Sequence, residues 1–163
     1  MTYRYLVLSD SHGFSGVLDT ILMAAEAGGK EADRTWAGVI HLGDDYHDLD
    51  PYEAALPPVI RLPGNCDPAF WCAPPDRIAF AVTLHGVRVF VTHGHRLGVR
   101  QGTDALVYRA ASERCRAALF GHTHMQTLRE DGGILLLNPG AAMDHHWAFL
   151  DISDDGRISA TLR

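Results

Sequence analysis

The sequence predicts an α/β sandwich in which two mixed β-sheets pack face to face with helices outside, formed by a single domain over residues 1–163. The length of 163 residues suits one domain, since single cores run about 100–200 residues. Strands that alternate with a helix in the first half favour parallel pairing, and the second half reads as hairpins. We find no internal repeat, low-complexity tract or linker that would divide the chain.

The first half predicts a β-α-β-β order. Residues 3–9 form an apolar run rich in Leu, Val and Tyr that ends in a polar turn, as a buried strand does. Apolar residues recur at helical spacing from Val17 to Ala25, and Gly28-Gly29 ends that helix. Two further strands are expected over 36–42 and 59–62. Each of them runs into a polar loop.

The second half changes to hairpins. We expect strands over residues 77–84, 87–92 and 117–120, and a helix over residues 103–115. His85-Gly86 reads as a two-residue hairpin turn between the first two of these strands. Two more hairpins are expected to turn at residues 131–133 and 154–156.

Composition narrows the possible partners. The chain carries 14 Lys and Arg against 20 Asp and Glu, a formal charge of −6, which argues against non-specific nucleic-acid binding and against attachment to an anionic membrane. A phosphate ligand would therefore need locally concentrated positive charge. Ten histidines are the unusual feature, because histidine is the commonest metal ligand and a proton shuttle.

The cysteines and the apolar runs bear on location. Three cysteines form neither an even set nor two close pairs, so neither a disulfide framework nor a structural zinc site is expected. The apolar run at the N-terminus is too short for a signal peptide, and no stretch approaches the about 18 residues of a membrane span. We therefore expect a cytoplasmic protein with reduced thiols.

Five predicted strand ends carry polar tips. These tips are Asp10-x-His12, Gly43-Asp44, Gly64-Asn65, His93-x-His95 and Gly121-His122-x-His124. Loops that leave the same edge of a sheet converge, and such edges hold the ligand sites of α/β folds. Residues i and i+2 of an extended chain point the same way. Three of the five tips contain such an i, i+2 pair, and we expect each of these pairs to aim two ligand atoms at one point.

The residue types indicate metal ions. Carboxylates, an amide and imidazoles without a thiolate pair suit Mn, Fe, Co, Ni or Zn. Seven candidate ligands exceed what one ion takes, and they suit two ions that share a carboxylate, as in phosphatases and nucleases. Two divalent ions would also leave positive charge after the ionised carboxylates of Asp10 and Asp44 are counted. The acidic composition therefore restricts only the surface.

In this order the five tips resemble the signature of the calcineurin-like metallophosphoesterase superfamily, over positions 10 to 140. The size and the motifs Gly64-Asn65-Cys66-Asp67, Thr92-His93-Gly94-His95 and Asn138-Pro139-Gly140 are similar to its small prokaryotic phosphodiesterase branch. The resemblance implies a four-layer αββα sandwich and a dinuclear centre. It also implies the ligands: Asp10, His12 and His124 for one metal, Asn65, His93 and His122 for the other, with Asp44 bridging.

The resemblance further implies in-line attack on phosphorus by a hydroxide that bridges two divalent ions, with Mn²⁺ expected first and Ni²⁺, Fe, Co²⁺ or Zn²⁺ as alternatives. Many members of the superfamily have His after the metal-binding Asn, whereas this chain has Cys66. We therefore propose His95 as proton donor to the leaving group, with solvent as the alternative. His47 is a candidate phosphate contact, and Arg100 is a lesser candidate for substrate binding.

Other polar and aromatic residues receive ordinary interpretations. His41 is expected to be packed or hydrogen-bonded, His85 to be a turn residue, and the adjacent His145 and His146 to lie in a surface loop. Asp45 and Asp67 are expected to position loops or ligands. Cys66 reads equally as a wall of the site or an incidental small residue. Trp71 and Trp147 are candidates for the pocket rim, but packing in the core or an interface is expected first.

The sequence thus predicts a phosphoesterase that hydrolyses a small phosphate ester, with a diester preferred. A monoesterase would need more basic groups than the motifs supply, and it remains an alternative. The alternative from another class is a non-catalytic scaffold, because the retromer complex contains a protein-interaction subunit of this fold. A homodimer or homotetramer is a further expectation from the resemblance.

Overall fold

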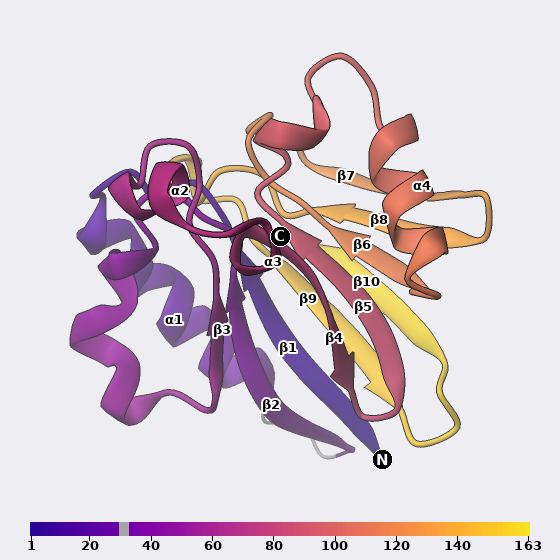
Figure 1. The fold of residues 1–163 in the computed structure, drawn as a ribbon. Coiled ribbons are helices and arrows are strands. Elements are labelled where there is room, and N and C mark those ends of the chain that lie inside the picture. Colours follow the sequence, from indigo (N-terminus) through magenta and orange to yellow (C-terminus); the bar gives the residue numbers. More distant parts are fainter. Residues whose placement is uncertain (30–32) are drawn as a thin grey trace.

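The computed structural model describes residues 1–29 and 33–163, and its two five-stranded sheets pack face to face (Figure 1). One sheet has the order β10-β9-β1-β2-β3 and the other the order β4-β5-β6-β8-β7. The first sheet contains β1 (Thr2–Leu8), β2 (Arg34–His41), β3 (Val59–Arg61), β9 (Ala148–Ser153) and β10 (Ile158–Leu162). The second contains β4 (Ala79–Leu84), β5 (Val87–Thr92), β6 (Ala117–Leu119), β7 (Thr127–Asp131) and β8 (Ile134–Asn138).

Both sheets are mixed, as predicted. In the first sheet β1, β2 and β3 run parallel, and β9 and β10 add an antiparallel hairpin. In the second sheet β5, β6 and β8 run parallel, with β4 and β7 antiparallel at the two edges. The carboxyl ends of β1 and β2, and those of β5 and β6, therefore lie at one edge of each sheet.

Side-chain alternation along the strands forms the layers. In β1, Tyr5 and Val7 face the core between the sheets, whereas Leu6 and Leu8 face α1 (Ser15–Gly29). In β5, Val89 and Val91 face the same inter-sheet core. Phe90 of β5 packs outward with buried residues of α4 (Asp104–Ser112). The four-layer sandwich is confirmed, with α1 on one side and α4 on the other (Figure 1).

The structure contains three short helical segments that the sequence did not predict. A 3₁₀ segment, η1 (Tyr46–Ala55), contains Pro51 and packs Leu49 beside α1. The helices α2 (Pro68–Cys72) and α3 (Pro75–Ile78) each begin with proline, which suits the first helical position because its fixed φ is helical and it needs no N–H there. Since α3 occupies residues 75–78, β4 begins at residue 79 instead of residue 77. Two single-turn 3₁₀ segments complete the elements, η2 (His95–Leu97) and η3 (Ala142–Asp144).

Main-chain hydrogen bonds bring the motif loops together. The N–H of Asp10 donates to the carbonyl oxygen of Gly43 at 2.9 Å, and the N–H of Gly121 donates to that of His93 at 3.0 Å. Neighbouring loops of each sheet are therefore fixed beside one another at the predicted edge. Among the residues described, no helix has the length and apolar character that crossing a membrane requires.

Candidate metal centre

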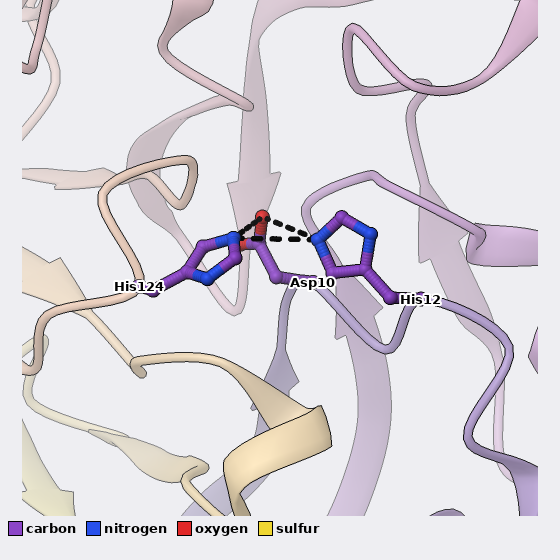
Figure 2. A group of neighbouring side chains, drawn as sticks. All are labelled: Asp10, His12 and His124. Atoms are coloured by element: carbon purple, nitrogen blue, oxygen red, sulfur yellow. Dashed lines mark hydrogen bonds and ion pairs between the residues drawn. The ribbon is translucent and has the colours of Figure 1, made fainter.

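Asp10, His12 and His124 form a first triad at this edge (Figure 2). The Oδ1 atom of Asp10 lies 3.0 Å from Nε2 of His124 and 3.6 Å from Nε2 of His12. The two Nε2 atoms are 3.3 Å apart. In Figure 2 the two imidazoles approach the carboxylate from opposite sides, so three ligand atoms converge on one point.

Asp44, His93 and His122 form a second triad whose ligand atoms lie within 4.8 Å of one another. The Oδ2 atom of Asp44 is 3.3 Å from Nε2 of His93. His93 comes from the end of β5, His122 follows β6, and Asp44 follows β2 in the other sheet. The triad therefore spans both sheets.

Asp44 also connects the two triads. Its Oδ2 lies 3.6 Å from Nε2 of His12, as well as beside His93. On the other side, Nε2 of His93 lies 4.0 Å from Oδ1 of Asp10. The two triads are thus one continuous cluster of carboxylate and imidazole atoms.

Three buried ligand atoms in this region make no hydrogen bond: Oδ1 of Asp10, Oδ1 of Asn65 and Nε2 of His93. The nearest ion-pair neighbours of the first and the third are His124 and Asp44, at the distances given above. Leaving a buried polar atom without a partner costs about 1–3 kcal/mol, and such atoms in proteins need an explanation. A bound cation would satisfy all three, because each presents a lone pair. The residues present therefore fit divalent metal ions.

Neighbouring main-chain groups orient the ligands. The Nδ1–H of His93 donates to the carbonyl oxygen of Leu42 at 2.8 Å, which leaves Nε2 free to accept a metal. Ser9 Oγ and the N–H of His122 both donate to Oδ2 of Asp10. The N–H of Cys66 donates to Oδ1 of Asp44 at 2.9 Å. In each carboxylate one oxygen is held and the other faces the cluster.

Asp67 positions the loop that contains Asp44, as expected from sequence. Its buried carboxylate accepts three backbone N–H bonds, from Gly64 at 2.7 Å, Asp44 at 2.8 Å and Asp45 at 2.9 Å. The loops after β2 and β3 are thereby joined through one side chain.

The electrostatics keep both carboxylates ionised and the imidazole of His122 neutral. Burial alone would raise the pKa of Asp10, but the imidazoles of His12 and His124 beside it hold that pKa well below its usual range. Burial likewise opposes ionisation of Asp44, and His93 outweighs it and lowers the pKa. Burial, followed by the charges of His93 and Arg100, lowers the pKa of His122 to about 4. Two anionic carboxylates and a neutral imidazole suit metal binding. Asp10 raises the pKa of His12. Burial would lower the pKa of His93, but Asp44 outweighs it and raises that pKa, so a metal would displace a proton from each of these two rings.

The proposed ligands converge through a left-handed backbone conformation, which the sequence did not predict. Five of the seven predicted ligands have positive φ and are not extended: Asp10 (56°), His12 (48°), Asp44 (63°), His122 (67°) and His124 (61°). Non-glycine residues rarely adopt this region, and such strained positions cluster at functional sites. The loops thus turn sharply at the ligands, and the expected i, i+2 alignment of extended chain does not apply to them.

Two glycines permit the close approach of these loops. A Cβ atom on Gly64 would lie 2.2 Å from Oδ1 of Asp44, and one on Gly121 would lie 1.9 Å from Oγ of Ser9. Neither site has room for a side chain. In the sequence, the glycines of Gly64-Asn65 and Gly121-His122 mark these two points of close approach.

A cavity of about 330 Å³ adjoins the second triad and is lined by Asn65, His95, Gly98, Arg100, Gln101 and His122. The Nδ1 atom of His95 lies 3.4 Å from Nε2 of His122, and Arg100 donates to the carbonyl oxygen of His122 at 3.2 Å. Asn65, His95 and Arg100 are therefore brought together, as the sequence predicts. Gln101 was not anticipated, because nothing in its sequence context marks it.

His47 lies elsewhere. It stands on η1 with 64% of its side chain exposed, and its Nδ1 is 3.1 Å from Oδ2 of Asp50. It is absent from the residues that line the cavity and from the described clusters. Its role as a phosphate contact stays a prediction that its position does not favour.

Cys66 is a wall of the site. Its Sγ lies within 4.8 Å of ligand atoms of His12 and Asp44. Burial and the charge of Asp44 raise the pKa of the thiol to about 11, so it is protonated at neutral pH. Of the two interpretations of Cys66, the structure supports the wall of the site.

The remaining histidines mostly have the expected surroundings. His41 is fully buried, and its Nδ1 accepts the N–H of Gly43 while its Nε2 lies 3.1 Å from Ser11 Oγ. His85 occupies a turn with positive φ and stacks on Tyr3. His145 is exposed, and His146 is half-buried with Nδ1 unpaired. Trp147 is buried as expected, but Trp71 is largely exposed.

Sequence comparison assigns the family. The model of the calcineurin-like phosphoesterase superfamily domain matches residues 3–155. The chain belongs to this superfamily. The probable metallophosphoesterase YsnB of Bacillus subtilis (strain 168) is 34% identical over 136 residues, which span 83% of this chain and 73% of YsnB.

Solved structures of other proteins share the fold. An archaeal phosphodiesterase has a TM-score of 0.71 at 18% identity, with 98% of this chain and 99% of that chain covered. Vps29 from Entamoeba histolytica, in complex with Zn²⁺, has a TM-score of 0.67 at 19% identity, with 98% of each chain covered. At these identities the likeness supports the sandwich fold alone.

Proposed function

We propose that the chain is a metal-dependent phosphodiesterase with a dinuclear centre. The observation that carries this proposal is the pair of triads joined at Asp44, with three buried ligand atoms directed into the cluster without a hydrogen bond. Membership of a phosphoesterase superfamily and the likeness to a metallophosphoesterase support the same chemistry.

The two triads together with Asn65 would hold two ions. Asp10, His12 and His124 would bind the first, and Asn65, His93 and His122 the second, with Asp44 between them. The ligand set is oxygen and nitrogen only, which favours Mn²⁺ and is compatible with Ni²⁺, Fe, Co²⁺ or Zn²⁺. Two divalent ions would supply charge for the phosphoryl oxygens and would lower the pKa of a water, which can then attack phosphorus in line with the leaving group.

The chain's own residues would hold the ester and move a proton. Arg100 lines the cavity beside His122 and would bind a non-bridging oxygen of the phosphate. His95 lies on the same wall and would donate a proton to the leaving oxygen. Its edge-to-face contacts with Phe70 and Trp71 fix the ring in place.

The single guanidinium in the cavity favours a diester. A phosphomonoester dianion carries one more negative charge than a diester, and it would need a further basic group. The other nearby arginine, Arg96, lies over the ring of Phe70, 5.0 Å from its centroid, and does not line the cavity. The cavity therefore matches a singly charged phosphodiester better.

A metal-replacement assay tests the proposal. Protein stripped with a chelator and refilled with Mn²⁺ should hydrolyse bis(4-nitrophenyl) phosphate, and should do so faster than 4-nitrophenyl phosphate. The Asp44→Ala variant is the matched control and should be inactive. Faster monoester hydrolysis would make the enzyme a monoesterase, and an inert Mn²⁺-loaded protein would leave the non-catalytic scaffold as the better function.

A further inference from the structure

Trp71 is exposed and yet held in a fixed position. It lies on α2 with 62% of its surface accessible. Its indole Nε1–H donates to the carbonyl oxygen of Asn65 at 3.0 Å, and its ring meets the buried ring of Phe70 edge to face, with centroids 5.1 Å apart. The polar atom of the indole is therefore satisfied within the chain, and what remains exposed is apolar ring surface.

The position of this ring is set relative to the cavity. The Trp71 ring lies 5.8 Å from that of His95, and the His95 ring lies 5.0 Å from that of His122. His95 and His122 line the cavity, and so does Asn65, whose carbonyl oxygen accepts the hydrogen bond from Trp71. Trp71 thus stands at the rim, one ring beyond the residues proposed to surround the phosphate.

The chemistry of this rim differs from that of the cavity. The cavity walls are imidazole, amide and guanidinium groups, which suit a phosphate. An exposed indole offers a flat apolar surface, which suits a planar aromatic group, and a nucleobase binds such a surface by stacking. In a nucleotide the sugar separates the base from the phosphate, so a ring platform beside a phosphate site matches that shape.

We propose that Trp71 determines substrate specificity by stacking on the base of a nucleotide-type phosphodiester whose phosphate occupies the cavity. This inference rests on the proposed function, because it assigns the phosphate to the metal-side cavity.

Binding of two probes tests the inference without turnover. AMP and ribose 5-phosphate carry the same phosphate and sugar, and only AMP has a base. Calorimetric titration of Mn²⁺-loaded wild-type protein should show AMP binding about tenfold more tightly than ribose 5-phosphate. In Trp71→Ala this ratio should fall toward one.

Two further variants separate stacking from other effects. Trp71→Phe keeps an aromatic ring but loses the hydrogen bond to Asn65, so it should retain most of the ratio if stacking is responsible. Tyr108→Ala removes a ring on α4 that is also largely exposed but lies outside the site, and it should keep the wild-type ratio. Equal affinities in the wild type, or a ratio that survives in Trp71→Ala, would overturn the inference.

The result is separable from the hydrolysis assay. A protein that binds AMP in a Trp71-dependent manner but hydrolyses no ester would refute the proposed hydrolysis and retain the nucleotide platform. A protein that hydrolyses the aryl diester but does not discriminate the two probes would retain the proposed function and refute the platform.

Discussion

His93 Nδ1 donates a hydrogen bond to the main-chain carbonyl oxygen of Leu42 at 2.8 Å, and this contact crosses from one sheet to the other. His93 follows β5 of the second sheet, and Leu42 follows β2 of the first. The packing of the two sheets therefore fixes both the tautomer and the direction of a proposed ligand. The metal centre depends on the sandwich and is not an addition to one loop.

Asp67→Asn should weaken metal binding and destabilise the fold. Oδ2 of Asp67 accepts from two backbone N–H groups and Oδ1 from a third, so an amide NH₂ would face a donor in either orientation. We expect Mn²⁺ affinity to fall about 10–100-fold and the free energy of unfolding to fall by about 1–3 kcal/mol. Calorimetric titration and urea unfolding measure these two quantities. Asp131→Asn on β7 is the control, and a variant equal to it would refute the positioning role.

Gly121→Ala should disrupt the first triad, and Ser9→Ala should partly restore it. The added Cβ would lie 1.9 Å from Ser9 Oγ and 2.8 Å from Oδ2 of Asp10. Removing the hydroxyl removes the nearest obstacle but leaves the contact with Asp10 and one with the Cβ of residue 9 at 2.9 Å. We therefore expect the double variant to bind Mn²⁺ more tightly than Gly121→Ala alone and less tightly than wild type. Additive losses in the double variant would contradict the steric explanation.

The metal-free protein should lose stability as the pH falls below about 6.5, in part through His41. Burial lowers the pKa of His41 to about 4, below its unfolded value, so the unfolded state takes up a proton first. The contribution of neutral His41 to the free energy of unfolding is fully present above pH 6.5. It is lost as the pH falls from 6.5 through 4, and the total loss is about 3 kcal/mol.

The His41→Asn variant isolates that contribution. It should be less stable at pH 7 but should lose less free energy of unfolding between pH 7 and pH 4.5 than wild type does. Urea unfolding in the presence of a chelator provides both curves. Parallel curves for the two proteins would show that His41 does not titrate as proposed.

His95→Ala should affect substrates according to their leaving group. An alkyl alkoxide needs a proton as it departs, whereas 4-nitrophenolate does not, so the variant should lose about 100-fold in kcat on an alkyl diester and only a few-fold on bis(4-nitrophenyl) phosphate. Parallel assays with Mn²⁺ give the two ratios. Equal losses on both esters would assign His95 to positioning and leave proton donation to solvent.

Much of the fold was predictable because its strands carry strong patterns. The apolar run over residues 3–9 and the turns near Gly132 and Gly156 placed strands and hairpins as the structure has them. The segment over residues 46–55 was missed because a 3₁₀ segment with Pro51 lacks helical periodicity. Pro68 and Pro75 each begin a helix, but helices of five and four residues are too short to show a helical period in the sequence.

The sequence predicted which side chains gather at one edge of the sheets but not their geometry. The motifs named all seven proposed ligands, because each follows a strand at the same edge. The left-handed backbone of residues such as Asp10 and His122 could not be predicted, since tertiary contacts impose it against local preference. A carbonyl such as that of Leu42 carries no side-chain signal. Trp71 was a candidate for the rim, but its placement depends on α2, which the sequence did not predict.

The number of metal ions per chain tests the dinuclear centre most directly. Protein refilled with Mn²⁺ and freed of excess ions would be measured by plasma mass spectrometry, beside Asp44→Ala whose folding is checked by circular dichroism. We predict two Mn²⁺ per wild-type chain and the loss of at least one in the folded variant. One ion or none in the wild type, or two in Asp44→Ala, would contradict the proposal.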